Sequence, residues 1–145
     1  MPVSGPDFFQ RFSDTFLSDD IDGFMTLIDP DCTWEIMATG ETFSGAGKVR
    51  ELAERSVAAR THTDEAHMKF VNHIVTDDQM CLEYVHEGII TEDWPASGDR
   101  PAVGSKFELP ICLVCQSRGG KFIRINEYFD LGTLIGGGRR ARLYS

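Results

Sequence analysis

The chain has 145 residues, the size of one domain with one hydrophobic core. Apolar residues make up 41% of it and charged residues 26%, which is typical of an ordinary globular protein. The 23 acidic and 14 basic side chains give a formal charge of −9, which argues against a nucleic-acid partner because binding phosphates requires a basic surface.

The sequence also argues against a membrane partner. No apolar run approaches the roughly 20 residues that cross a bilayer. The first residues lack the basic and apolar regions of a secretion signal, so we expect a cytoplasmic location.

All four cysteines, Cys32, Cys81, Cys112 and Cys115, lie in strand-like sequence and are expected to be buried free thiols. Cys112 and Cys115 have C-x-x-C spacing, but strand residues three apart point to opposite faces. We therefore expect no metal or redox site there.

The first 60 residues indicate three helices and one strand. Apolar residues recur at helical spacing over residues 7–18, 21–28 and 44–60. Asp19 or Asp20 caps the second helix and Ser44 caps the third. Between these helices, residues 32–37 form a strand that begins after Asp29-Pro30-Asp31 has ended the second helix, and residues 39–47 form a loop.

The later residues indicate strands at 67–76, 79–92, 106–117 and 120–132, with a long loop at 93–104. Helices early in the chain and strands late in it predict an α+β fold, with the helices covering one face of an antiparallel sheet. We expect one domain over residues 1–132 and a flexible Gly/Arg-rich tail over residues 133–145.

The last strand contains the first candidate for chemistry. Alternate strand residues share a face. This rule puts Ile123, Ile125, Glu127, Phe129 and Leu131 on one face, and Phe122, Arg124, Asn126, Tyr128 and Asp130 on the other. The second face holds a carboxylate, a phenol and an amide within an apolar strand. A buried carboxylate is costly unless it is partnered, so Asp130 is the candidate.

The pattern also leaves one face of the sheet uncovered. The helices can cover only one apolar face, and no further segment is available for the other, around Val85, Ile123, Ile125 and Phe129. Because a large uncovered apolar surface marks an association site, we expect a homodimer through the outer sheet face.

The order of elements and the ending from Arg124 to Gly132, Arg-Ile-Asn-Glu-Tyr-Phe-Asp-Leu-Gly, resemble the nuclear transport factor 2-like superfamily. Within it, the chain resembles the SnoaL-like polyketide cyclases and limonene-1,2-epoxide hydrolase, relatives of ketosteroid isomerase. The resemblance covers about residues 7–132 and implies a cone-shaped fold, in which a curved sheet wraps around the helices. It also implies an apolar pocket for a hydrophobic substrate and proton transfer without a cofactor. No cluster of side chains has metal-ligand spacing, so we expect no metal.

The resemblance carries over residue by residue. Asp130 matches the last aspartate of the Asp-Tyr-Phe-Asp ending of the epoxide hydrolase branch. An Arg-x-Asp pair of that branch falls on Tyr84 and His86, and a Tyr-x-Asn pair falls on Trp34 and Ile36. Since only one of three elements is kept, the resemblance favours an isomerase or cyclase over an epoxide hydrolase.

The resemblance implies that Asp130, His86 and Tyr84 face one pocket. Asp130 would be the acid/base, His86 its partner or a second acid/base, and Tyr84 a hydrogen-bond donor to a developing oxyanion. The pocket lining would include Trp34, Ile36, Phe107, Leu109, Ile111, Asn126 and Tyr128. Two alternatives stay open: a limonene-type epoxide hydrolase, and a non-catalytic ligand-binding or assembly module in which His86 and Asp130 only satisfy core groups.

Overall fold

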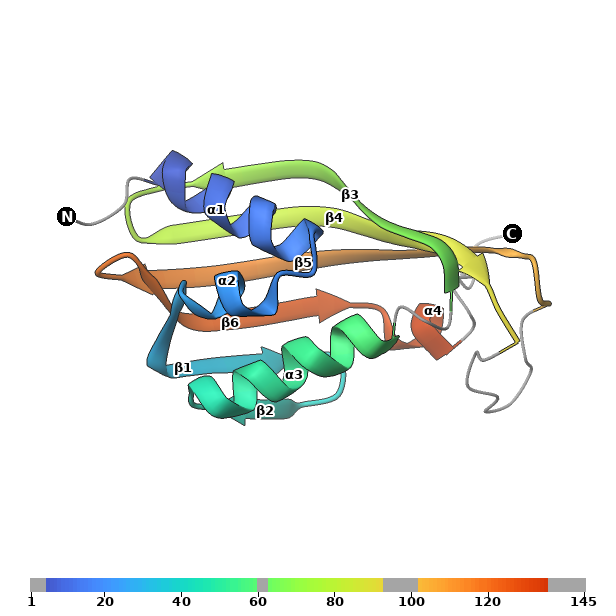
Figure 1. Cartoon of the computed structure of the whole chain (residues 1–145), viewed down its shortest axis with the longest axis horizontal. Coiled ribbons are helices and arrows are strands. Elements are labelled where there is room, and N and C mark those ends of the chain that lie inside the picture. The colour runs from blue at the N-terminus through green and yellow to red at the C-terminus, as the bar shows by residue number, and fades with distance from the viewer. Residues whose placement is uncertain (1–4, 60–62, 93–101, 136–145) are drawn as a thin grey trace.

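The structure, a computed structural model, describes residues 5–59, 63–92 and 102–135 (Figure 1). Three helices lie across one face of a single sheet of six strands, and a fourth, short helix follows the last strand. The elements are α1 (Gly5–Leu17), α2 (Ile21–Met25), β1 (Ile28–Ile36), β2 (Glu41–Ser44), α3 (Ala46–Ala59), β3 (Thr63–Val75), β4 (Gln79–Ile90), β5 (Lys106–Arg118), β6 (Lys121–Phe129) and α4 (Leu131–Ile135). The α+β prediction is confirmed.

The sheet has the strand order β2-β1-β6-β5-β4-β3. Strands β3 to β6 form an antiparallel meander, whereas β1 pairs with β6 in parallel. The parallel pair brings the early strand against the last one, with Trp34 beside Ile125 and Ile36 beside Glu127.

The core lies between this sheet and the helices. The apolar face of α1 contributes Phe8 and Phe12, and both rings contact Phe122 of β6, with centroids 4.4 and 5.7 Å apart. From α2, Phe24 packs edge-on against Trp34 at 6.2 Å. Each buried aromatic ring of this kind contributes roughly 1.5–3 kcal/mol by removal from water, so these contacts hold α1 and α2 to the sheet.

The second helix is shorter than the sequence predicts. Asp20 caps it, because its Oδ1 accepts a hydrogen bond from the Gly23 backbone N–H at 2.9 Å. It ends at Met25 because the chain is drawn into the sheet immediately afterwards: the Phe122 backbone N–H donates to the Leu27 carbonyl oxygen at 2.7 Å. Strand β1 therefore begins before Pro30 rather than after it.

Strand β2 lies inside the segment predicted as a loop. Thr42 and Phe43 pair with Glu35 and Trp34, which adds a short edge strand beside β1. Ser44 ends that strand, and α3 begins at Ala46 after Gly45, whose φ of +90° favours glycine.

The last strand changes phase at a β-bulge. Ser117 pairs with Phe122 and Gln116 with Arg124, so Ile123 has no partner in the register. Beyond it, Ile125, Glu127 and Phe129 join Phe122 on the inner face, while Arg124, Asn126 and Tyr128 point outward. The predicted assignment of faces is therefore wrong from Arg124 onward, because it carried strict alternation through the extra residue Ile123.

The chain continues from β6 directly into α4, so the predicted domain boundary at residue 132 falls inside a helix. Residues 93–101, most of the predicted long loop, and residues 136–145, most of the predicted tail, lie outside the described residues. No helix within the described ranges is long and apolar enough to cross a membrane.

Candidate functional site

A carboxylate on the inner, helix-covered face of the sheet is the centre of the candidate site. Glu127 on β6 points inward, and the indole N–H of Trp34 on β1 donates to its Oε1 at 3.1 Å. Trp34 is 4% exposed and packs in the main core. The parallel pairing of β1 with β6 places the two side chains side by side although they are 93 positions apart.

Burial raises the pKa of the Glu127 carboxyl group, and the hydrogen bond from Trp34 offsets part of that rise. Burial does so because the charged form loses its hydration. A carboxyl group with a raised pKa is a stronger base when ionised and can also hold a proton nearer to neutral pH. This is the property that general acid/base catalysis requires.

Two predicted residues occupy the inner face of β4. Tyr84 is 3% exposed and lies edge-on to the rings of Phe16 and Phe70, at 5.8 and 6.1 Å. His86, two residues further on, lies edge-on to the Phe107 ring at 5.3 Å.

Four predicted pocket residues, Trp34, Phe107, Leu109 and Ile36, lie on the same inner surface, and Ile111 packs there beside Phe129. The structure therefore places together most of the predicted lining. That these lining residues contact a substrate remains a prediction.

Glu127 and His86 do not touch. Glu127 pairs with Leu113, which pairs with Leu82, whereas His86 pairs with Leu109. The two residues are thus two strands apart and four positions apart along the strands, about 13 Å along and about 9.5 Å across. Tyr84 lies between them, on the row of paired residues that also contains Ile111 and Phe129. Glu127 and His86 therefore lie at opposite ends of an inner surface that is apolar apart from Tyr84.

Asp130 does not face this surface. It is exposed, just past the end of β6, and caps α4: its Oδ2 accepts hydrogen bonds from the Thr133 backbone N–H at 2.9 Å and the Thr133 hydroxyl at 2.6 Å. Those hydrogen bonds hold the pKa of Asp130 below its usual value. The predicted pairing of Asp130 with His86 in a pocket is wrong, because the strand ends at Phe129 and its alternation no longer applies.

Asn126 and Tyr128 are also misplaced by the prediction. Both point to the outer face beyond the bulge, and Tyr128 is 43% exposed. The sequence did contain a signal for Glu127, since it was the only charged residue on a face otherwise made of isoleucine, phenylalanine and leucine. A carboxylate that lies among apolar side chains has to be hydrogen-bonded, catalytic or both.

A small cavity of about 30 Å³ lies against Trp34, between the α1–α2 turn and α3. Phe16 and Phe24 line one side and Ala53 and Val57 the other. This space holds one or two water molecules but no ring-containing molecule. A substrate that enters here has to displace α2 from α3.

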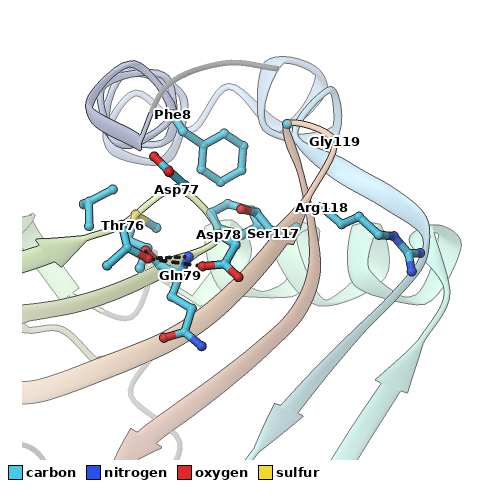
Figure 2. Close-up of a pocket in the computed structure, with 12 residues that line it drawn as sticks. Phe8, Thr76, Asp77, Asp78, Gln79, Ser117, Arg118 and Gly119 are labelled. Carbon is cyan, nitrogen blue, oxygen red and sulfur yellow. Dashed lines mark hydrogen bonds between the residues drawn. The ribbon is translucent and has the colours of Figure 1, made fainter. Parts of the chain in front are cut away.

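A second cavity, of about 100 Å³, lies at the end of the sheet where the β3–β4 and β5–β6 turns meet α1 (Figure 2). Phe8, Asp77, Asp78 and Ser117 line it. The β3–β4 turn is closed by the Gln79 backbone N–H, which donates to the Thr76 hydroxyl at 3.1 Å. None of the predicted catalytic residues lines this cavity.

No group of three or more histidine, cysteine, aspartate or glutamate side chains in the described part of the chain is arranged to hold a metal ion. Cys112 and Cys115 lie on opposite faces of β5, since Cys115 is buried in the core and Cys112 lies on the outer face.

Solved structures share this fold at low sequence identity. A proposed SnoaL-like polyketide cyclase from Jannaschia sp. CCS1 superposes with a TM-score of 0.71 at 14% identity, covering 94% of this chain and 92% of that one. A proposed polyketide cyclase from Pseudomonas putida KT2440 gives 0.69 at 16% identity, covering 94% and 99%. A protein with a ketosteroid isomerase-like fold from Catenulispora acidiphila DSM 44928, in complex with trimethylamine, gives 0.69 at 17%, covering 93% and 94%.

These likenesses establish the fold, which is that of the nuclear transport factor 2-like proteins, as the sequence predicted. No curated protein sequence matches the chain significantly. The family model of the SnoaL-like domain matches residues 9–125, which include most of α1, all of α2 and α3, and the sheet strands up to the middle of β6. The chain belongs to the SnoaL-like domain family.

Proposed function

We propose that this protein is a cofactor-independent enzyme that transfers a proton on a hydrophobic, ring-containing carbonyl compound, with Glu127 as the acid/base. The observation that carries the proposal is the Trp34–Glu127 hydrogen bond at 3.1 Å on the inner face of the sheet, together with burial that raises the pKa of Glu127. Glu127 replaces Asp130 in the role that the sequence suggested.

In the reaction, the ionised Glu127 takes a proton from the carbon next to the substrate carbonyl and returns it at another position. The electron pair left behind moves onto the carbonyl oxygen. Tyr84, the nearer of the two β4 residues, donates a hydrogen bond to that oxygen, which stabilises the charge that develops in the transition state. The indole of Trp34 orients the carboxylate throughout.

The inner surface supports an apolar substrate class. The row between Glu127 and His86 consists of Phe129, Ile111 and Tyr84, and Leu109 and Phe107 extend it. A structural relative named TerC, with a TM-score of 0.69 at 17% identity over 91% of this chain and 95% of its own, was co-crystallised with polyporic acid. A flat ring-containing molecule of the polyketide kind fits this chemistry, and the reaction would be an isomerisation or a cyclisation.

The test uses a ring ketone that exchanges its acidic protons slowly in buffer. The probe is 2-tetralone, and proton NMR follows the incorporation of solvent deuterium next to its carbonyl. The wild-type protein is expected to accelerate the exchange. Glu127→Gln keeps an oxygen that can accept from Trp34 but cannot carry the proton, so it should lose roughly 10²- to 10⁴-fold of the rate.

Asp130→Asn is the matched control, because it removes a carboxylate three residues away while asparagine can still cap α4. It should retain the wild-type rate. If the Glu127→Gln protein exchanges the probe as fast as the wild type, or if Asp130→Asn is the variant that fails, Glu127 is not the acid/base.

Epoxide hydrolysis is the alternative within the enzyme class. The same variants can be tested with limonene-1,2-epoxide as the probe, with the diol as the measured product. Tyr84 and His86 stand on β4 where that branch has its arginine and second carboxylate, so we expect no turnover. A non-catalytic binding module would bind 2-tetralone without accelerating its exchange.

We also propose that the protein pairs with a second copy through the outer sheet face. Half-buried Val85 and Ile123 and exposed Val114 and Tyr128 lie there, on the face opposite α1, α2 and α3. Ile125 and Phe129, which the sequence assigned to this face, lie inside instead.

A further inference from the structure

Two cysteines that the sequence did not associate meet on the outer face of the sheet. The Sγ atoms of Cys81 on β4 and Cys112 on β5 are 3.6 Å apart. Both residues are free thiols and partly exposed, whereas Cys32 and Cys115 are buried at 0% and 2% exposure. In the monomer this pair is therefore the accessible dithiol of the chain, since all four cysteines lie in described residues. Because Cys112 is the neighbour of Tyr128 on the face proposed for the dimer, oxidation is expected in the dissociated monomer.

The register explains how the two sulfur atoms come together. Cys81 pairs with Val114 and Cys112 pairs with Glu83, so the cysteines lie on a diagonal between neighbouring strands. Side chains on such a diagonal can reach each other across the sheet. Both point outward, because Leu82 and Leu113, the next residues on each strand, are fully buried on the inner face.

We propose that Cys81 and Cys112 form a reversible intramolecular disulfide when the protein meets a peroxide. The sulfur atoms need to approach by about 1.5 Å to reach bonding distance, which rotation of the two side chains together with a small approach of the two strands would provide.

The chemistry balances with one peroxide per bridge. One cysteine attacks a peroxide oxygen, the O–O bond breaks, and a sulfenic acid and water form. The second cysteine then attacks the sulfenic sulfur, the S–S bond forms, and the oxygen leaves as a second water. The two thiols lose two electrons and two protons in all, and hydrogen peroxide is reduced to two waters.

The position of the bridge favours a reversible modification over a permanent one. A diagonal between strands is wider than the separation that an unstrained disulfide prefers. Strained or exposed disulfides have higher reduction potentials and are reduced more easily than buried structural ones. Burial and the neighbouring thiol raise the pKa of Cys112 to about 11, so the reaction with peroxide should be slow at neutral pH and faster at alkaline pH.

The test is thiol counting on the full chain. The reduced, folded protein is treated with a small excess of hydrogen peroxide, unfolded in urea, blocked with N-ethylmaleimide and weighed by mass spectrometry. The expected result is a product with two fewer maleimide groups and a cross-linked peptide pair that contains Cys81 and Cys112. Reduced glutathione should restore all four thiols.

Cys81→Ser and Cys112→Ser should abolish the cross-link, and Cys115→Ala, which removes the C-x-x-C spacing but leaves the pair intact, should keep it. Three results would overturn the proposal: no loss of thiols in the wild type, a cross-link that involves Cys32 or Cys115, or disulfide-linked dimers in place of the internal bridge. A non-reducing gel separates the last outcome from the others.

Discussion

Two carboxyl groups three positions apart, Glu127 and Asp130, have opposite surroundings. Glu127 lies on the inner face of the sheet with one neutral donor, Trp34, and burial raises its pKa. Asp130 is exposed, and two hydrogen bonds from Thr133 lower its pKa. The difference comes from the end of one strand. It leaves Glu127 as the candidate acid/base and Asp130 as the cap of α4.

The opposite shifts predict opposite effects of pH on stability. Because its folded pKa is raised, Glu127 favours the folded state only while it is protonated. Its contribution to the free energy of unfolding falls as pH rises from the usual glutamate value of about 4.3 up to the folded pKa. Asp130, whose folded pKa is lowered, contributes stability above the usual aspartate value of about 3.9 that is lost as pH falls through its folded pKa.

Urea unfolding of the wild type and of Glu127→Gln at a series of pH values measures the pH dependence of the free energy of unfolding. The free energy of unfolding of the variant should lack the decline between about pH 4.3 and the folded pKa. The variant should therefore become more stable relative to the wild type as pH rises. Asp130→Asn should instead flatten the acid side of the profile. Parallel profiles for the wild type and Glu127→Gln would show that Glu127 is as well solvated in the folded state as in the unfolded one.

At the scale of the elements, periodicity predicted most of the fold. Helical spacing identified α1 and α3, and alternation identified β3, β4, β5 and β6, because each of these elements buries one regular stripe of apolar side chains. The short elements β2 and α4 were missed, since neither is long enough to show a period. Their positions depend on tertiary contacts, such as the pairing of Phe43 with Trp34 and the Asp130 cap.

The candidate site was less predictable than the fold. The bulge at Ile123 depends on how β6 pairs with β5, and no residue in the sequence marks it. A shift of one residue moves every later side chain to the opposite face. The sequence therefore identified the strand that carries the inward-facing carboxylate but chose Asp130 instead of Glu127, whereas Trp34, Tyr84 and His86 lie on the inner face as predicted.

The absence of a side chain at Gly23, within α2, leads to a prediction about the Asp20 cap of that helix. A Cβ atom at Gly23 would lie 2.2 Å from Asp20 Oδ2 and 2.8 Å from Thr15 Cγ2. Gly23→Ala should push the Asp20 side chain away and break its cap on α2, which typically costs about 1 kcal/mol. Gly47→Ala, on α3 with no atom within 4 Å of the new Cβ, is the control and should be neutral or slightly stabilising.

Thermal unfolding of the two alanine variants compares them directly. A 145-residue domain should lose a few degrees in Tm for a change of about 1 kcal/mol. Equal melting temperatures for Gly23→Ala and Gly47→Ala would mean that α2 does not depend on its Asp20 cap. Since α2 borders the cavity beside Trp34, Gly23→Ala should also alter the exchange of 2-tetralone.

At the scale of the whole molecule, a net charge of −9 and an outer sheet face with exposed apolar side chains have opposite effects on self-association. Charge of one sign disfavours self-association, and salt screens it. The apolar contact depends much less on salt. A dimer that forms through this face should therefore become tighter as ionic strength rises, whereas an association held by ion pairs should weaken.

Tyr128→Glu tests the dimer. Tyr128 is 43% exposed near the middle of the outer face, where its neighbour on β5 is Cys112. A buried aromatic side chain at an interface contributes enough that its replacement by a carboxylate should raise the dimer Kd roughly tenfold or more. Val103→Glu adds the same charge at a residue that is 54% exposed and precedes β5, beyond the end of that strand, and should leave the dimer intact. Sedimentation equilibrium over a range of concentrations gives the mass of each protein. A wild type that sediments as a monomer at every concentration and salt level would contradict the dimer, and equal Kd values for the two variants would place the interface elsewhere on the molecule.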